Sequence, residues 1–156
     1  MNQTSPAPGP TDLHESAGHL VRRVHQNMLL AFSQVMHDHD VTNVQFATLK
    51  AIASLEPATQ KEIAAFIAME PSNMHSVLRR LQERGLVLVR QSRSDRRRHE
   101  IRLSKAGRTL FSAIEPLEAE VGPRFLAALS DNERVQFVRL LKKLAFSPVG
   151  GGRAGP

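Results

Sequence analysis

The chain has 156 residues, of which 41% are hydrophobic, and it contains no cysteine. This length supports one folded core, and the lack of cysteine excludes disulfides, thiolate nucleophiles and thiol-based redox sensing. The net charge is +6, and the apolar runs are too short for a signal peptide or a membrane span, so we expect a cytoplasmic protein without a membrane partner. Residues 1–11 and 147–156 are rich in proline or glycine and are predicted to be disordered tails.

A long helix is predicted within residues 12–41. Asp12 and Glu15 have the spacing of a capping box, in which each side chain accepts a hydrogen bond from the other residue's backbone N–H. Apolar residues then recur at helical spacing to about His37, with no proline between them. A domain this small does not need such a stripe to cover its own core, so we expect a dimerisation helix.

Two short helices are predicted at the start of segment 42–107. Thr42 and Thr59 are each followed three residues later by Gln or Glu, which repeats the capping-box spacing. The apolar residues that follow predict helices over about 44–54 and 60–68.

A third helix and a hairpin follow. Pro71 stands in the first turn of the helix, where its missing N–H costs nothing, and Gly85 ends the helix in the left-handed conformation. Strands are predicted over about 86–91 and 99–103. Two short helices with a tight turn between them, the second followed by a hairpin, are typical of a winged helix-turn-helix. Segment 42–107 is therefore predicted to be a DNA-binding domain of the mainly α (α+β) class, with a two-stranded wing.

Segment 108–146 is predicted to form further dimerisation helices. Ser104 caps a helix that Pro116 and Pro123 bend or divide, and Ser130 opens the last helix with another capping box. Pairing with a second copy would cover the apolar stripes of these helices. A two-fold homodimer would place two recognition helices about one DNA turn apart, roughly 34 Å, which matches a palindromic operator in double-stranded DNA.

Basic residues are concentrated in one part of the sequence. Between Arg79 and Arg108 there are eleven basic and three acidic residues, a local charge of +8, which exceeds the +6 of the whole chain. Neutralising each DNA phosphate with arginine or lysine releases condensed counterions, so a basic patch confined to one unit predicts binding to a polyanion.

The helix that begins at Pro71 has a polar side opposite its apolar residues. Residues near its amino-terminal end are predicted to contact base edges, and its two arginines bases or phosphates. These candidates are Ser72, Asn73, His75, Ser76, Arg79 and Arg80. A solvated helix surface would show the same pattern, but the adjacent arginine-rich hairpin favours DNA.

The hairpin turn supplies the remaining DNA-binding candidates, Arg93, Asp95, Arg96, Arg97 and Arg98. A carboxylate fixes a guanidinium in bidentate geometry, so we expect Asp95 to aim one arginine. We assign Arg97 to the minor groove or its edge, and Arg96 and Arg98 to phosphates.

These residues resemble the MarR (multiple antibiotic resistance regulator) family of bacterial transcription factors. The resemblance rests on R-R-L-Q-E-R-G-L-V at Arg79–Val87, D-R-R at Asp95–Arg97 and L-S-K-A-G at Leu103–Gly107, and it extends from about Gly18 to Leu144. It implies a homodimer on a pseudo-palindromic operator, usually a repressor. It also implies release from DNA when a small molecule binds between the dimerisation and DNA-binding parts. Many members have an acidic residue at the position of Ser92, so we expect a looser wing turn.

Two stretches are similar to family members that control aromatic-acid catabolism and sense aromatic carboxylates or their coenzyme A thioesters. These are G-H-L-V-R-R-V-H-Q at Gly18–Gln26 and V-T-N-V-Q-F-A-T-L at Val41–Leu49. Arginine pairs well with a carboxylate, and four polar residues share one side of the predicted first helix. The candidate effector-binding residues are therefore His19, Arg22, Arg23 and Gln26. The same four residues equally suit a solvent-facing surface or salt bridges within a dimer.

Three other functions are weighed against an operator-specific repressor. His37 and His39 with a neighbouring Asp suggest a metal-responsive repressor, but the spacing of the other histidines and the lack of cysteine disfavour it, so no metal or cofactor is predicted. No Ser-His-Asp order or phosphate-binding glycine loop occurs, so we do not expect an enzyme. A sequence-independent architectural protein would lose affinity by one factor on every DNA when its arginines are removed.

Overall fold

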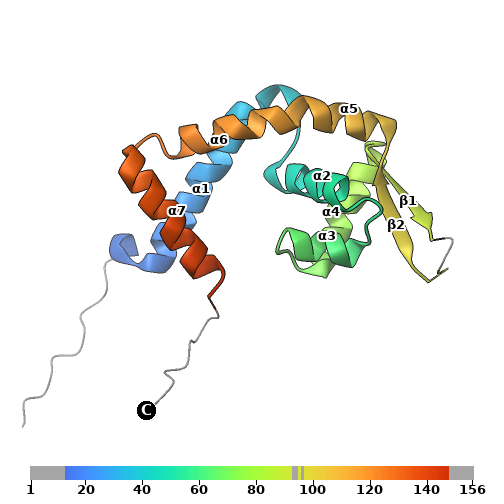
Figure 1. Ribbon diagram of the computed structural model, residues 1–156, viewed down its shortest axis with the longest axis horizontal. Helices are drawn as coiled ribbons and strands as arrows, with labels where there is room; N and C mark the ends of the chain where they lie inside the picture. Colours follow the sequence, from blue (N-terminus) through green and yellow to red (C-terminus); the bar gives the residue numbers. More distant parts are fainter. Residues whose placement is uncertain (1–12, 93–94, 96, 148–156) are drawn as a thin grey trace, which may run out of the picture.

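The computed structural model describes residues 13–92, 95 and 97–147. The predicted tails lie outside the described residues, except for Ser147. The α-helices and strands in chain order are α1 (Ala17–Val35), α2 (Asn43–Leu55), α3 (Gln60–Phe66), α4 (Pro71–Glu83), β1 (Val87–Gln91), β2 (His99–Leu103), α5 (Lys105–Ile114), α6 (Glu118–Phe125) and α7 (Asp131–Ala145). In Figure 1, α2 to β2 lie on one side, α1, α6 and α7 on the other, and α5 crosses above. The mainly helical fold with a two-stranded wing is as predicted.

The first long helix is shorter than predicted. A 3₁₀ turn, Leu13–Glu15, precedes α1, and Ser16 between them has the extended backbone of a cap residue. The single helix expected from residue 12 is therefore wrong, because the extended backbone at Ser16 interrupts it. The helix also ends at Val35, before the expected His37. Asp12, the predicted cap, lies outside the described residues.

The core lies mainly within the winged-helix unit, by which we mean residues 42–107, and it extends to the end of α1 and to α5. Leu49, Ile63 and Leu81, from α2, α3 and α4, are fully buried and pack in one cluster. The capping boxes predicted at Thr42 and Thr59 both form, and these boxes begin α2 and α3 where the sequence places them. Helices α2 and α3 therefore begin at capped residues, and all three short helices have one buried side.

The wing is a regular antiparallel hairpin that is hydrogen-bonded to the core near its base. Val87 pairs with Leu103 at one end of the ladder, and the Ile101 N–H donates to the Ala58 carbonyl at 2.7 Å. Gly85 has φ +67°, the left-handed conformation predicted for the end of α4. A Cβ at Gly107 would lie 2.0 Å from the carbonyl oxygen of Leu86, so α5 begins at a distance from the hairpin that only glycine permits.

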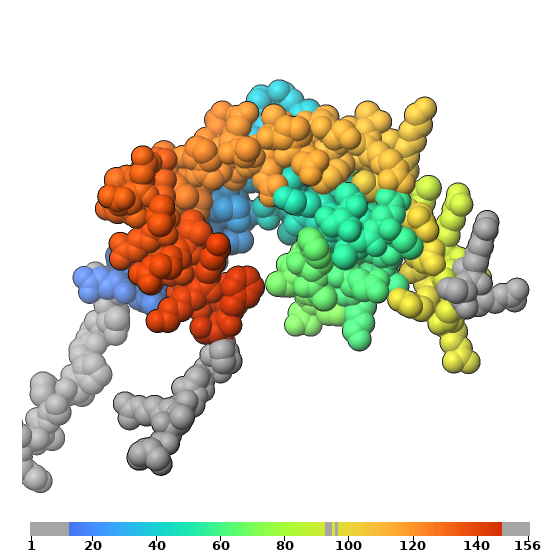
Figure 2. Space-filling view, in the orientation of Figure 1, coloured from blue at the N-terminus to red at the C-terminus, as the bar shows by residue number. Residues whose placement is uncertain are grey.

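The flanking helices bury few residues of their own. Pro116 lies in the 3₁₀ turn Glu115–Leu117, which divides the predicted long helix into α5 and α6, whereas Pro123 lies inside α6. Neither α6 nor α7 contains a buried residue. Figure 2 shows an open hollow beneath α5, between α7 and the winged-helix unit. Within the described residues, no helix has the length and apolar character required to span a membrane.

Candidate nucleic-acid interface

Helix α4 presents a polar side to solvent next to the wing. Met74, Leu78 and Leu81 are buried on its other side, which fixes its rotation about its own axis. The six predicted DNA-contacting residues of α4 are all exposed: Ser72, Asn73, His75, Ser76, Arg79 and Arg80. Their exposure leaves their side chains available to base edges and phosphates.

Two of these side chains already have partners on their own helix. The Ser76 hydroxyl donates to the Asn73 carbonyl at 2.9 Å, and Arg79 Nε lies 3.7 Å from Glu83 Oε1. Both contacts are exposed, so a DNA partner can compete with them. Among the described residues, no ion pair involves Arg80.

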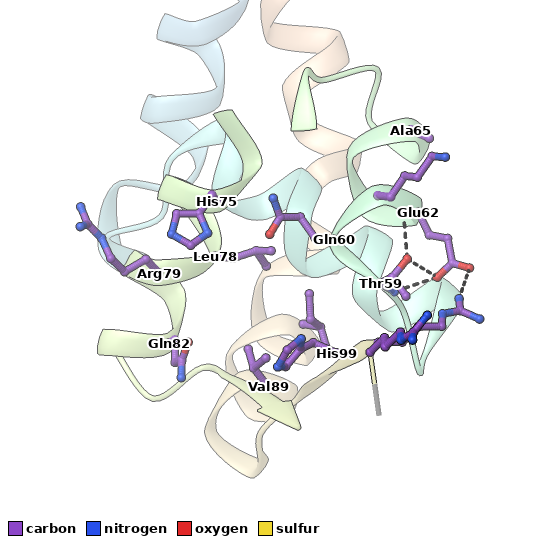
Figure 3. Close-up of a pocket in the computed structure, with 14 residues that line it drawn as sticks. Thr59, Gln60, Glu62, Ala65, His75, Leu78, Arg79, Gln82, Val89 and His99 are labelled. Carbon is purple, nitrogen blue, oxygen red and sulfur yellow. Dashed lines mark hydrogen bonds and ion pairs between the residues drawn. The ribbon is translucent and has the colours of Figure 1, made fainter. Parts of the chain in front are cut away.

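A cavity of about 990 Å³ lies between α3, α4 and the wing (Figure 3). Its apolar lining comes from Ala65, Leu78, Val89 and Ile101. Its polar lining comes from all three elements and consists of Thr59, Gln60, Lys61, Glu62, His75, Arg79, Gln82, Arg97, Arg98 and His99. The structure thus brings predicted residues of α4 and of the wing to one concave surface.

Six polar residues of this surface are absent from the sequence-based candidates: Thr59, Gln60, Lys61, Glu62, Gln82 and His99. Helical spacing could have identified Gln82, because it follows His75 by seven residues and Arg79 by three, which places all three on the same side of α4. Lys61 and His99 approach α4 only through the packing of α3 and the wing, which spacing along one helix does not reveal.

Asp95 shapes the wing turn through its backbone contacts. Its carboxylate accepts a hydrogen bond from the backbone N–H of Arg97 at 2.9 Å, and its carbonyl accepts one from the Arg98 N–H at 2.9 Å. We expected the Asp95 carboxylate to pair with a guanidinium group, but it contacts the backbone of Arg97 and not its guanidinium. A carboxylate two residues before an N–H forms this local turn readily, so the short-range contact is the one made. Arg93 and Arg96 lie outside the described residues.

Arg98 pairs with α3, although the sequence assigns it to phosphate. Its Nη2 lies 3.5 Å from Glu62 Oε1, and Thr59 donates to the other carboxylate oxygen from its backbone N–H and its hydroxyl. The Thr59 N–H and hydroxyl, with a smaller contribution from Arg98, hold the pKa of Glu62 below its ordinary value of 4.5. Glu62 therefore caps α3 and holds a wing arginine at the same time.

Ser92 closes the base of the wing turn. Its hydroxyl donates to Glu100 at 2.7 Å, and its backbone N–H donates to the Arg98 carbonyl at 2.8 Å. The side chain is buried. The serine hydroxyl thus supplies a hydrogen bond across the base of the hairpin, and the looser turn stays a prediction.

The basic stretch from Arg79 to Arg108 divides into two groups. Five of its arginines pair with carboxylates, and these are Arg79, Arg84, Arg98, Arg102 and Arg108. Within the described part of the chain, Arg80, Arg90, Arg97 and Lys105 have no ion pair. The local charge of +8 is therefore only partly available to DNA.

The four candidate effector-binding residues lie on α1. Arg22, Arg23 and Gln26 are exposed, and His19 is half-buried with its ring 5.6 Å from that of His14. None of the four lines the cavity beside α4. Their role in binding an effector stays a prediction.

The histidines near the end of α1 have local partners. His37 Nδ1 lies 3.1 Å from the Gln34 carbonyl oxygen, and His37 Nε2 lies 3.2 Å from Asp38. Over residues 13–92, 95 and 97–147, no group of three or more His, Asp or Glu side chains could hold a metal ion.

Comparisons with known proteins agree with this geometry. Residues 41–99 match the model of the MarR family. The HTH-type transcriptional repressor NicR of Pseudomonas putida is 30% identical over 143 residues, which cover 92% of this chain and 90% of NicR.

Two solved structures extend the likeness to the whole fold. BpsR of Bordetella bronchiseptica, whose DNA binding is regulated by 6-hydroxynicotinic acid, has a TM-score of 0.81 at 28% identity, covering 90% of this chain and 100% of BpsR. The repressor CouR of Rhodococcus jostii RHA1, bound to a 23-mer DNA duplex, has a TM-score of 0.76 at 25% identity and covers 90% and 99% of the two chains. On this similarity in sequence and fold, the chain belongs to the MarR family.

Proposed function

We propose that this chain is a transcriptional repressor that binds a pseudo-palindromic operator as a homodimer and releases it when a small aromatic acid, or its coenzyme A thioester, binds. One observation carries the DNA-binding part: His75 and Arg79 of α4 and Arg97 and Arg98 of the wing line a single concave surface. The proposed role is one of binding, without catalysis, in the cytoplasm.

Helix α4 and the wing each suit a different part of the duplex. A helix fits the major groove, where amides such as Asn73 read adenine and guanidinium groups such as Arg79 read guanine. The exposed Arg97 suits the narrow minor groove, whose negative potential attracts arginine. Arg80, exposed and without an ion pair among the described residues, suits a phosphate.

The flanking helices support dimerisation. Val135, Leu144 and Phe146 at α7 are 72%, 72% and 86% exposed, and Val21 of α1 is 63% exposed. Large apolar side chains left this exposed on both flanking helices indicate surface that another chain covers. A second copy would cover it and duplicate the DNA-binding surface about one helical turn away.

The effector class is supported by the similar proteins. BpsR responds to 6-hydroxynicotinic acid, a heteroaromatic carboxylate. The exposed guanidinium groups of Arg22 and Arg23 on α1 offer fork-shaped donors for such a carboxylate. We therefore assign carboxylate recognition to this part of α1.

A binding titration tests both parts of the proposal. Labelled DNA from beside the protein's own gene is compared with scrambled DNA of equal length at fixed salt, and we expect at least a thousandfold preference for the operator. Aromatic acids, beginning with 6-hydroxynicotinic acid, and their coenzyme A thioesters are then added to the operator complex. At least one is expected to release the DNA, and Arg22→Ala with Arg23→Ala should weaken that release without weakening DNA binding.

The DNA-binding part and the effector part of the proposal can be refuted independently. Equal affinity for operator and scrambled DNA would favour the architectural alternative. A specific complex that no aromatic acid or thioester dissociates would remove the effector assignment and leave the repressor assignment in place.

A further inference from the structure

Arg84 belongs to the basic stretch, yet it does not line the cavity between α3, α4 and the wing. It is the cap residue that follows the last residue of α4, and its side chain is 32% exposed, compared with 64% for Arg79. Its Nη1 donates to the Asp40 carbonyl at 2.8 Å and lies 3.4 Å from Gln45 Oε1. Its Nη2 lies 3.6 Å from the Asp40 carboxylate. One guanidinium therefore contacts two residues more than 35 positions earlier in the chain.

These two partners stand where the chain enters the winged-helix unit. Asp40 lies between α1 and α2, with a left-handed backbone (φ 46°). Gln45 completes the capping box of α2, and its side-chain oxygen accepts the Thr42 N–H at 3.0 Å. Arg84 thus connects the carboxyl end of α4 to the linker, residues 36–42, that joins α1 to α2.

The linker is the covalent connection between α1 and the winged-helix unit. Only the last turns of α1 are buried, at Ala31, Phe32 and Val35, and the Phe32 ring lies 5.7 Å from that of Phe46 in α2. The rest of α1 extends beyond the core, as Figure 1 shows. Fixing α4 to the linker therefore fixes α4 relative to α1.

We propose that Arg84 is a positioning residue that sets the orientation of α4 relative to the dimerisation helix α1, and that it does not contact phosphate. The inference rests on the proposed function, because orientation matters when two α4 helices must reach half-sites at one spacing. A guanidinium with several donors in a fixed fork suits this role, since it holds a direction as well as a distance.

Salt dependence separates a positioning arginine from a phosphate contact. Operator affinity is measured between 50 and 200 mM salt for the wild type, Arg84→Gln and the matched variant Arg80→Gln, which changes an exposed arginine of the same helix. Losing a phosphate contact lowers the slope of log affinity against log salt by about 0.9, or about 1.8 for both protomers. We expect that fall for Arg80→Gln. For Arg84→Gln we expect an unchanged slope with an affinity about tenfold lower.

Half-site spacing gives a readout that simple destabilisation would not change. On operators lengthened or shortened by one base pair at the centre, the wild type should discriminate strongly and Arg84→Gln weakly. Arg84→Lys, which can still donate to the Asp40 carbonyl, should restore part of the discrimination. A slope that falls in Arg84→Gln as in Arg80→Gln, or spacing discrimination equal to that of the wild type, would overturn the proposal.

A measurement without DNA keeps this inference separate from the proposed function. Backbone amide exchange should become faster in Arg84→Gln in both the linker and the end of α4, and neither should change in Arg80→Gln. If the wild type shows no preference for its operator, the proposed function fails, and the exchange result still decides whether Arg84 joins the two segments. Exchange unchanged in both segments would count against Arg84 in either case.

Discussion

The winged-helix unit and the helices that flank it bury their apolar residues in very different proportions. In the unit, Leu49, Ile52, Ile63, Met74 and Leu81 are fully buried. The flanking helix α7 is as regular and has an equally good capping box, yet none of its residues is buried. The winged-helix unit buries its apolar residues within one chain, whereas α7 needs a partner chain to cover its apolar residues.

This difference separates two physical requirements of a DNA reader. Holding α4 and the wing in position needs a rigid core, because base contacts tolerate little displacement. Holding two such units at a fixed spacing needs an interface between two chains, and α1 and α7 carry exposed apolar side chains for it. Changes confined to one region should therefore affect either fold stability or assembly, but not both.

The largest effect is expected from breaking the interface. Changing Leu141 and Leu144 of α7, which are 43% and 72% exposed, to Glu should convert the dimer to a monomer with an intact winged-helix unit. Operator affinity should fall at least about a hundredfold, because the two half-sites no longer bind as one linked unit. Sedimentation and DNA titration measure both effects. Leu55→Glu, a change of the same kind at the end of α2, is the control, and a double variant that remains dimeric would contradict the assignment.

A second change should break the core and spare the interface. In Gly107→Ala the new Cβ meets the Leu86 carbonyl oxygen at 2.0 Å, so α5 and the hairpin must separate. We expect a loss of about 3 kcal/mol in the free energy of unfolding, measured in urea at fixed protein concentration. Gly18→Ala is the control, because nothing lies within 4 Å of its added Cβ, and it should stabilise α1 by up to about 1 kcal/mol. Equal stability of the two variants would show that the close approach is unimportant.

The smallest expected effect is on the pH dependence of stability. It is measured at the same kind of capping box in each region, at the start of α3 and at the start of α7. Hydrogen bonds from Thr59 and Ser130 hold the pKa values of Glu62 and Glu133 below 4.5. A lowered folded-state pKa stabilises the fold above the ordinary value and loses that contribution as pH falls through the lowered one. Stability should therefore depend less on pH below about 4.5 in Glu62→Gln and in Glu133→Gln than in the wild type.

DNA binding distinguishes these two variants at neutral pH. Only Glu62 also holds Arg98, so only Glu62→Gln should change operator affinity, by about threefold per protomer. If both variants leave operator affinity unchanged, or keep the pH dependence of the wild type, the double role of Glu62 is refuted.

Local patterns predict most of the fold. The capping boxes at Thr42, Thr59 and Ser130 form as the sequence indicates, because the interacting groups are only three residues apart. The predicted start of the first helix is wrong because Asp12 and Ser16 both suit a cap position, and spacing alone does not choose between them. The choice depends on backbone conformation around Ser16.

The site is less completely predicted, for a reason of distance. The exposed side of α4 follows from helical spacing, since Met74 and Leu78 must face the core. Contacts such as Arg98 with Glu62 and Arg84 with Asp40 join residues 36 and 44 positions apart. Charge counting along the sequence cannot separate such structural arginines from those left for DNA.

In the proposed complex, α4 reads bases while the wing supplies affinity. The most direct measurement compares the affinities of wild type, Asn73→Ala and Arg97→Ala for operator and scrambled DNA at one physiological salt concentration. We predict that Asn73→Ala loses about tenfold on the operator and little on scrambled DNA. We predict that Arg97→Ala, still dimeric, binds the operator at least about tenfold more weakly. Equal losses on both DNAs for Asn73→Ala, or wild-type operator affinity for Arg97→Ala, would contradict the account.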